Sequence, residues 1–273
     1  MIIMLNNLII VKPNERRKRI LRWLEVIDRE WYVEELAEKL NVSHQTIRRD
    51  LVSLKAADSI IRTLGGCIFN NRDIIKTTYY KVSELNFTHK RFIGMEASKL
   101  IQPGNVILIA DGSTNYHLAS QLGNCGHVVV YTNSISASTV LGRFSNIDLY
   151  LLGGRFDINN EMIFLRGNMT EQMLMKLDFD FVFVSTDAID ENGTCQLRSE
   201  DIARTNQIIL ERGKQKILLA DPSKTKATGN FPFAKLSDFD LWITTVGIEE
   251  KLMQGFMEQA SIKEVSINPY NNP

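Results

Sequence analysis

Hydrophobic residues recur at helical spacing in three short segments near the start of the chain. Residues 15–28, 33–40 and 44–55 each place their aliphatic side chains on one face, as amphipathic helices do. Ser43 directly precedes the third segment, where the hydroxyl of an N-cap residue can accept an unpaired backbone N–H. Two short helices joined by a tight turn predict a helix-turn-helix.

A β-hairpin is expected directly after the third helix. Residues 60–69 contain two β-prone runs on either side of the pair Gly65-Gly66. This hairpin would form the wing of a winged helix-turn-helix. Arg62 lies in its first strand and is a candidate DNA contact.

Beyond residue 90 the pattern changes to short, continuously apolar runs that alternate with amphipathic stretches. The runs predict strands over 106–110, 127–131, 148–152, 181–184, 216–220 and 241–244. The stretches between them predict helices over 91–101, 115–122, 135–143, 170–176 and 200–212. Buried strands alternating with helices indicate an α/β domain with a mainly parallel sheet that helices cover on both faces.

Five segments of the chain follow from these changes of pattern. We expect a leader over 1–13, a winged helix-turn-helix over 14–70, a polar linker over 71–88, an α/β domain over 89–250 and a C-terminal segment over 251–273. The leader is apolar but has neither a cationic start nor a small-residue cleavage site, so it is not typical of a signal peptide. A floppy leader and a strand packed on a partner both remain open.

Composition and charge narrow the class of protein. The 273 residues are 44% hydrophobic and 23% charged, which is typical of a globular chain. The net charge is zero, which excludes a globally basic polyanion binder, but residues 1–70 carry a small positive excess. Three cysteines without CxxC spacing indicate reduced thiols and no metal centre. No apolar run is long enough to span a bilayer, so we expect a cytoplasmic protein. We also expect no cofactor.

The third predicted helix carries side chains suited to DNA recognition. Arginine can form paired hydrogen bonds with guanine or phosphate, and glutamine can pair with adenine. The candidate DNA-binding residues of this segment are Ser43, His44, Gln45, Thr46, Arg48 and Arg49. A helical bundle with solvated charges is the alternative on pattern alone.

Polar turns follow the predicted strands, at the sheet edge where parallel sheets bind their ligands. Helix N-termini with free N–H groups and hydroxyls suit an anion, and a lysine adds a mobile positive charge. The candidate ligand-binding residues are Asp111, Gly112, Ser113, Thr114, Thr132, Asn133, Ser134, Gly153, Gly154 and Lys224. Serine and threonine also cap helices, but several such turns on one edge favour a phosphate-bearing ligand.

The first seventy residues resemble the winged helix-turn-helix of the DeoR family of bacterial transcription regulators. The likeness runs from about Asn14 to Phe69, and the family's signature is present from Ser43 to Leu51. The resemblance implies that the third helix enters the major groove of operator DNA.

The remainder resembles the sugar-phosphate sensor domain of the same family, from about His89 to Glu249. The matching motifs, in order, are Ile101-Gln102-Pro103-Gly104, Gly112-Ser113-Thr114, Thr132-Asn133-Ser134, Leu151-Leu152-Gly153-Gly154, Gly193 and Leu219-Ala220-Asp221-Pro222-Ser223-Lys224. The resemblance implies a fold similar to ribose-5-phosphate isomerase and glucosamine-6-phosphate deaminase, and it adds Glu200 to the ligand-binding residues. Where the family commonly has Asp, this chain has Ala110, and Asp111 follows one residue later.

The resemblance predicts a repressor of a carbohydrate-utilisation operon whose affinity for double-stranded operator DNA is controlled by a phosphorylated sugar. We expect a homo-oligomer, because one helix-turn-helix covers only a half-site. One alternative is a sugar-phosphate isomerase or deaminase with an appended DNA-binding module, in which Asp187, Asp190 or Glu200 would be catalytic. Another is a DNA-binding protein whose second domain binds no ligand and only oligomerises.

Overall fold

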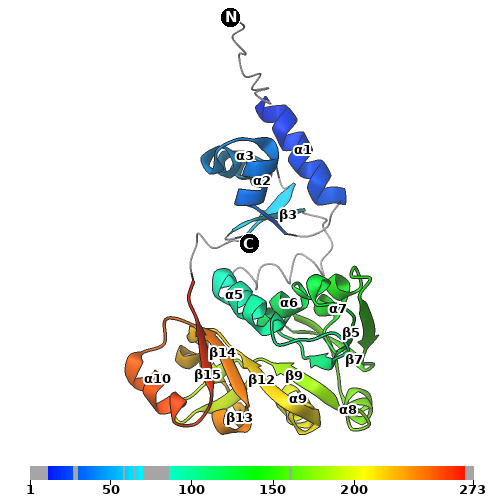
Figure 1. Cartoon of the computed structure of the whole chain (residues 1–273), viewed down its shortest axis with the longest axis vertical. Coiled ribbons are helices and arrows are strands. Elements are labelled where there is room, and N and C mark those ends of the chain that lie inside the picture. The colour runs from blue at the N-terminus through cyan, green and yellow to red at the C-terminus, as the bar shows by residue number, and fades with distance from the viewer. Residues whose placement is uncertain are drawn as a thin grey trace, which may run out of the picture. The chain divides into compact units, whose positions relative to one another are not determined.

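The computed structural model describes residues 12–26, 30–57, 59–63, 65–69, 86–159 and 162–267. The chain divides into an N-terminal unit, Met1–Tyr80, and a C-terminal unit, Lys81–Pro273 (Figure 1). Most of the predicted leader and linker lies outside the described residues. The predicted domain boundaries therefore stay predictions.

The described part of the N-terminal unit contains three helices and a small antiparallel sheet. Its elements are α1 (Pro13–Val26), β1 (Trp31–Tyr32), α2 (Val33–Leu40), α3 (His44–Ala56), β2 (Ile60–Arg62) and β3 (Gly66–Phe69). The strands pair in the order β1-β3-β2. The three predicted helices and the hairpin are confirmed, whereas β1 has two residues and is too short to show a periodic pattern.

Aliphatic side chains at helical spacing form the core of this unit. Ile20 and Leu24 of α1, Leu36 of α2, and Ile47 and Leu51 of α3 are all fully buried in one cluster. Each fully buried aliphatic side chain contributes about 1.5–3 kcal/mol to folding. The packing therefore fixes which face of α3 points outward.

The turn between α2 and α3 depends on two polar residues. Asn41 adopts a left-handed conformation with φ of 50°, which asparagine tolerates better than most residues. The side-chain oxygen of Ser43 accepts a hydrogen bond from the Thr46 N–H at 3.2 Å. This confirms the predicted N-cap and starts α3 at His44.

A seven-stranded sheet forms the centre of the C-terminal unit. Its strands are β4 (Val106–Ile109), β5 (Val128–Thr132), β6 (Ile147–Leu151), β9 (Phe179–Val184), β12 (Gly213–Leu219), β14 (Leu241–Thr245) and β15 (Ile262–Val265). They are hydrogen-bonded in the order β15-β14-β12-β9-β4-β5-β6, and every pair is parallel. The predicted parallel sheet is confirmed, and β15 is an additional strand.

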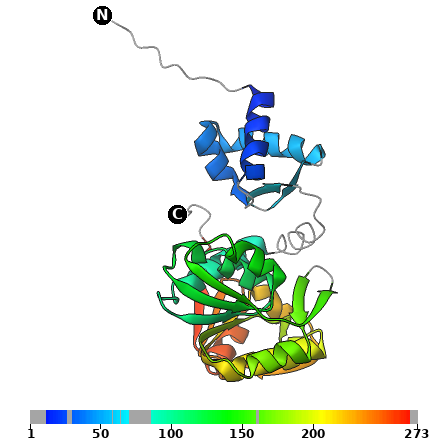
Figure 2. The ribbon, with the colours of Figure 1, turned by 90° about the vertical axis from the view of Figure 1, so that its right-hand side faces the viewer.

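Helices cover both faces of this sheet (Figures 1 and 2). One face packs on α5 (Phe87–Ser98), α6 (Ser113–Ala119) and α7 (Ile135–Leu141), and the other on α8 (Asn168–Leu174), α9 (Glu200–Arg212) and α10 (Glu250–Met257). Successive strand residues alternate between the two cores: Ile107 and Ile109 enter the first, and Leu108 and Ala110 enter the second. Burial on both faces explains the continuously apolar strands.

Several short elements were not predicted from the sequence. They are the hairpin of β7 (Arg155–Asn159) and β8 (Met162–Arg166), the small antiparallel sheet of β10 (Ala188–Ile189), β11 (Thr194–Leu197) and β13 (Phe231–Lys235), helix α10, and the 3-10 helices η1 (Leu122–Asn124), η2 (Pro222–Lys226) and η3 (Leu236–Asp238). Among the helices that the structure describes, none is long and apolar enough to cross a membrane.

Candidate functional site

Helix α3 presents most of the predicted DNA-contacting residues on an exposed face. The exposed residues of this face are His44, Gln45, Arg48, Arg49 and Val52, and Thr46 is half-buried. The sequence analysis did not single out Val52, whose side chain is 63% exposed. An apolar side chain one helical turn after the two arginines suits contact with a thymine methyl group.

Asp50 lies on the opposite side of α3 and anchors the helix. It is 4% exposed and forms an ion pair with Arg16 of α1, and Arg17 Nε lies 3.5 Å from its other carboxylate oxygen. Buried charges are tolerated when they are paired in this way. Two members of the basic cluster near the start of the chain therefore hold α3 in place.

The two remaining DNA candidates are Ser43, which is exposed, and Arg62, which is half-buried. The Ser43 hydroxyl caps α3 and lies 2.9 Å from Thr46 Oγ1. Arg62 is half-buried in β2, and its Nε is buried without a hydrogen-bond partner. Their contacts with DNA stay predictions.

The ends of neighbouring parallel strands bring the candidate ligand residues to one edge of the sheet. Asp111 follows β4 and Asn133 follows β5, and the Asp111 N–H donates to Asn133 Oδ1 at 3.0 Å. Ser185 follows β9, and its hydroxyl lies 3.5 Å from the Asp111 carbonyl. A Cβ at Gly112 would collide with the Ser185 hydroxyl, so only glycine fits there. The edge is thus assembled as the sequence predicted.

Asn115 holds this edge together and was missed by the sequence analysis. Its side chain is fully buried, and Nδ2 donates to the carbonyls of Ala110 at 2.9 Å and Phe183 at 3.3 Å. It therefore joins the ends of β4 and β9. Its Oδ1 is buried without a hydrogen-bond partner.

The side chains of residues 132–134 form hydrogen bonds within the protein. Thr132 Oγ1 donates to the Ile109 carbonyl at 2.7 Å, and Ser134 Oγ accepts from the Ala137 N–H at 3.2 Å as the N-cap of α7. Asn133 Nδ2 donates to the Leu165 carbonyl at 3.2 Å and ties β8 to the sheet edge. These residues shape the loop, and their contact with a ligand stays a prediction.

Asp111 carries an unusual carboxyl group. Burial raises its pKa to about 7, although hydrogen bonds from Ser134 and the Gly112 N–H oppose the shift, and the nearby charge of Asp187 adds to it. Asp111 Oδ1 is buried without a hydrogen-bond partner. A ligand hydroxyl or amino group would meet an unfilled acceptor at this position.

Lys224 lies in η2, which follows β12 at the same edge. Asp221 is 1% exposed, and its Oδ1 accepts hydrogen bonds from the Ser223 N–H and from Asn86 Nδ2, both at 3.0 Å. The Lys224 N–H donates to the Asp221 carbonyl at 3.0 Å. The turn that carries the lysine is therefore tied to Asn86, the N-cap of α5.

Gly153 and Gly154 follow β6 and allow close packing. The Gly153 carbonyl accepts from Thr170 Oγ1 at 2.7 Å, and a Cβ at Gly154 would lie 2.8 Å from the Arg166 carbonyl oxygen. The glycines thus let α8 and β8 approach the end of β6. Their contact with a ligand stays a prediction.

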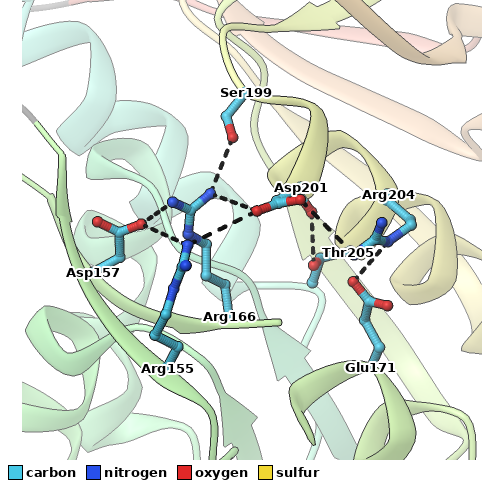
Figure 3. A network of polar contacts seen from close by, with 8 residues as sticks. All are labelled: Arg155, Asp157, Arg166, Glu171, Ser199, Asp201, Arg204 and Thr205. Carbon is cyan, nitrogen blue, oxygen red and sulfur yellow. Dashed lines mark hydrogen bonds and ion pairs between the residues drawn. The ribbon is translucent and has the colours of Figure 1, made fainter. Parts of the chain in front are cut away.

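An ionic network connects the β7–β8 hairpin to the start of α9 (Figure 3). The Arg166 guanidinium forms ion pairs with Asp157 and with Asp201 at 3.1 Å. Glu171 pairs with Arg204, with 2.9 Å between Oε1 and Nε. Glu200 is the exposed first residue of α9, and its predicted contact with a ligand is untested.

The carboxylates considered for catalysis have backbone partners. Asp187 Oδ2 accepts from the Arg198 N–H at 2.9 Å, and Asp190 Oδ1 accepts from the Thr194 N–H at 2.8 Å.

His117 is buried, which lowers its pKa to about 3, so its ring is neutral near pH 7. Within the described part of the chain, no three His, Cys, Asp or Glu residues form a group that could hold a metal ion.

Two family models match the chain. The DeoR-like helix-turn-helix domain matches residues 16–73, and the DeoR C terminal sensor domain matches residues 85–245.

Curated relatives match over most of the chain. The HTH-type transcriptional repressor GlcR of Bacillus subtilis is 32% identical over 217 residues, which cover 77% of this chain and 80% of that protein. The L-fucose operon activator of Haemophilus influenzae is 29% identical over 92% of this chain and 99% of that protein. The lactose phosphotransferase system repressor of Lactococcus lactis is 30% identical over 92% of this chain and 98% of that protein.

Solved structures match more weakly. Ribose 5-phosphate isomerase A from Methanocaldococcus jannaschii is 21% identical with a TM-score of 0.38, over 51% of this chain and 55% of that one. The translation initiation factor eIF-2B of Pyrococcus horikoshii is 16% identical with a TM-score of 0.38, over 78% of this chain and 72% of that one.

Proposed function

The chain belongs to the DeoR family of transcription regulators, and on that premise we propose that it represses a carbohydrate-utilisation operon under the control of a phosphorylated sugar. Two relatives support this function: one is named as a transcriptional repressor and the other as a repressor of the lactose phosphotransferase system. The observation that carries it is the exposed Arg48 and Arg49 face of α3 in the same chain as a parallel sheet with polar strand ends. Such a protein acts where the DNA is, and we place it in the cytoplasm.

The recognition helix reads operator DNA in the major groove. Gln45, Arg48 and Arg49 stand on the outward face that Asp50 and Arg16 hold in position. Phosphate contacts from the arginines fix the register, and contacts with base edges select the sequence. The operator is double-stranded, and two copies of the chain read its two half-sites.

The sugar phosphate binds at the edge formed by the ends of β4, β5, β9 and β12. The mobile ammonium group of Lys224 pairs with the phosphate, and the Gly112-Ser113-Thr114 turn contributes N–H and hydroxyl donors. The unfilled Oδ1 of Asp111 accepts a hydrogen bond from a sugar hydroxyl or amino group. The ligand changes DNA affinity only if it binds one arrangement of the protein more tightly than another.

Turnover distinguishes this function from the alternative of a sugar-phosphate isomerase or deaminase. A perturbed carboxyl such as Asp111 at a sheet edge is also a feature of enzyme sites. Incubation with a panel of pentose, hexose and amino-sugar phosphates is expected to give saturable binding without product. Product formation would contradict the regulatory function.

Calorimetry tests the position of the binding site. Lys224→Ala is expected to weaken binding of the sugar phosphate at least about tenfold, because it removes the charge that faces the phosphate, equivalent to about 1.4 kcal/mol. Lys226→Ala, an exposed lysine of the same turn, is the matched control and is expected to bind as the wild type does. Equal binding by Lys224→Ala and the wild type would move the site elsewhere.

A further inference from the structure

A valine is exposed on the face of α3 that carries the DNA candidates. Val52 is 63% exposed, and among the described residues of the N-terminal unit it is the one large hydrophobic side chain that is prominently exposed. Lysine, glutamate or alanine would favour a helix more at such a position, because the branched Cβ of valine loses rotamer freedom there. Neither burial nor helix stability therefore accounts for a valine at this position.

Helical spacing places Val52 in line with three polar candidates. Gln45, Arg48, Arg49 and Val52 occupy positions i, i+3, i+4 and i+7, which lie on one face of an α-helix. All four residues are exposed, and we call them the recognition face. The recognition helix of homeodomains turns residues of the same spacing toward the major groove. The spacing therefore makes Val52 the fourth residue of this face.

The charges beside Val52 fit a nucleic acid. Arg48 and Arg49 precede it by one helical turn, and both are exposed. Asp50, the acidic residue of α3, is buried in its ion pair with Arg16 and leaves the face basic. A basic surface attracts the phosphates of DNA or RNA.

The apolar side chain distinguishes between these nucleic acids. The major groove of B-DNA admits a helix, and the C5 methyl of thymine is the apolar group that its bases display there. The major groove of A-form RNA is too deep and narrow for side chains to read. An exposed valine on a basic helix therefore matches a thymine of double-stranded DNA.

The dimensions of the helix set where this thymine lies. An α-helix rises about 1.5 Å per residue, so Val52 lies about 6 Å along the axis from Arg48. Base pairs of B-DNA are about 3.4 Å apart, so this length corresponds to about two base pairs for a helix that lies along the groove. We therefore expect the thymine about two base pairs from the base that Arg48 contacts.

We propose that Val52 is a specificity-determining residue that packs on the C5 methyl group of one thymine in each operator half-site. The contact selects thymine over cytosine, which lacks this methyl group. It adds a preference that the arginines do not supply, since arginine pairs with guanine or phosphate. The inference rests on the proposed function for the entry of α3 into the major groove.

Selection from a random pool of DNA duplexes tests the base preference. The full wild-type chain is expected to select half-sites with a thymine about two base pairs from a guanine. Val52→Ala is expected to lose the preference at that one position and to keep the others, because alanine does not reach the methyl group. Val246→Ala, in which a 45% exposed valine of the C-terminal unit is changed, is the matched control.

Uracil in place of the selected thymine tests the contact itself, because it removes only the methyl group and keeps the base pair. In anisotropy titrations at fixed salt, we expect uracil to weaken wild-type binding about fourfold, as the loss of one buried methyl group predicts. The same change is expected to weaken Val52→Ala binding less than about 1.5-fold, because the partner of the methyl group is already missing.

Each outcome decides the inference. A uracil effect that disappears in Val52→Ala and persists in Val246→Ala, with unchanged circular dichroism of both variants, supports the contact. A uracil effect of equal size in the wild type and Val52→Ala overturns it, and so does a selected half-site without a preferred thymine.

Arg48→Ala on the selected duplex separates the two proposals. If this variant binds weakly while uracil has no effect on the wild type, only the Val52 contact fails. If the full wild-type chain selects no duplex, the proposed function fails and the inference fails with it.

Discussion

The carboxyl group of Asp111 makes the stability of the protein depend on pH. Because its folded pKa is raised to about 7, the folded state holds a proton that the unfolded state releases near its ordinary pKa of ~4. Its stabilising contribution is present below about pH 4 and is lost as the pH rises through 7. His117 acts in the opposite direction, because its lowered pKa removes stability as the pH falls below about 6.5.

Asp111→Asn removes this dependence. We expect the variant to gain stability relative to the wild type as the pH rises from 5 to 8, by roughly 2.5 kcal/mol, because it avoids a buried charge. Thermal unfolding of both proteins at the two pH values measures the difference, and the His117 contribution cancels in the comparison. An unchanged difference between pH 5 and pH 8 would show that Asp111 titrates normally.

Arg48 and Arg49 are expected to dominate DNA binding. Each Ala substitution should cost ~1–3 kcal/mol in operator affinity, because a paired arginine contact with guanine or phosphate is lost. Lys55→Ala is the matched control, an exposed basic residue in the last turn of α3. Gel-shift titrations at fixed salt measure all three. Wild-type affinity in both arginine variants would remove α3 from the DNA interface.

At the scale of elements, the ion pair of Asp50 and Arg16 is expected to determine whether α3 stays in position. Asp50→Ala breaks this buried ion pair, and breaking a buried pair by removing one member typically costs about 3–5 kcal/mol. We expect calorimetry to show a lower unfolding temperature for the N-terminal unit and an unchanged one for the C-terminal unit. Glu38→Ala, an exposed acid on α2, serves as the control. A single unchanged transition in Asp50→Ala would contradict the role of the pair.

Elements with a clear pattern of hydrophobic residues were predictable from the sequence. Elements that depend on contacts with distant parts of the chain were not. The amphipathic spacing of α2 and the apolar run of β4 depend only on their own residues. The β7–β8 hairpin instead depends on distant partners, since Asn133 bonds to Leu165 and Arg166 pairs with Asp201. Such pairings leave no periodic signal in the sequence.

In the candidate site, the placement of the residues was predictable from the sequence, but their hydrogen bonding was not. Parallel strands require that Asp111 and Asn133 meet at one edge, so that placement was predictable. Which polar groups are already used within the protein depends on distances that the sequence does not contain. Thr132 is fully engaged, whereas Asn115 and Asp111 each keep a buried oxygen without a partner.

At the scale of the whole molecule, the hydrogen bond of Asn86 to Asp221 connects the Lys224 turn to the start of α5. We expect Asn86→Gly to reduce the effect of the sugar phosphate on DNA affinity while keeping the affinity for the ligand within about threefold. Glycine preserves the left-handed backbone of Asn86, whose φ is 58°, and removes only the side chain. Ligand binding measured with and without operator DNA gives the coupling. Full coupling in Asn86→Gly would exclude this connection.

The effect of a phosphorylated sugar on operator binding tests the central claim most directly. The full chain is titrated into labelled DNA from upstream of its own gene, and fluorescence anisotropy measures the binding. The titration is repeated with each sugar phosphate and with the same sugar lacking phosphate. We expect one sugar phosphate to change the dissociation constant roughly 5–150-fold, equivalent to ~1–3 kcal/mol of coupling, and the unphosphorylated sugar to leave it unchanged. Operator affinity that stays constant with every sugar phosphate, including any that calorimetry shows to bind, would contradict the account.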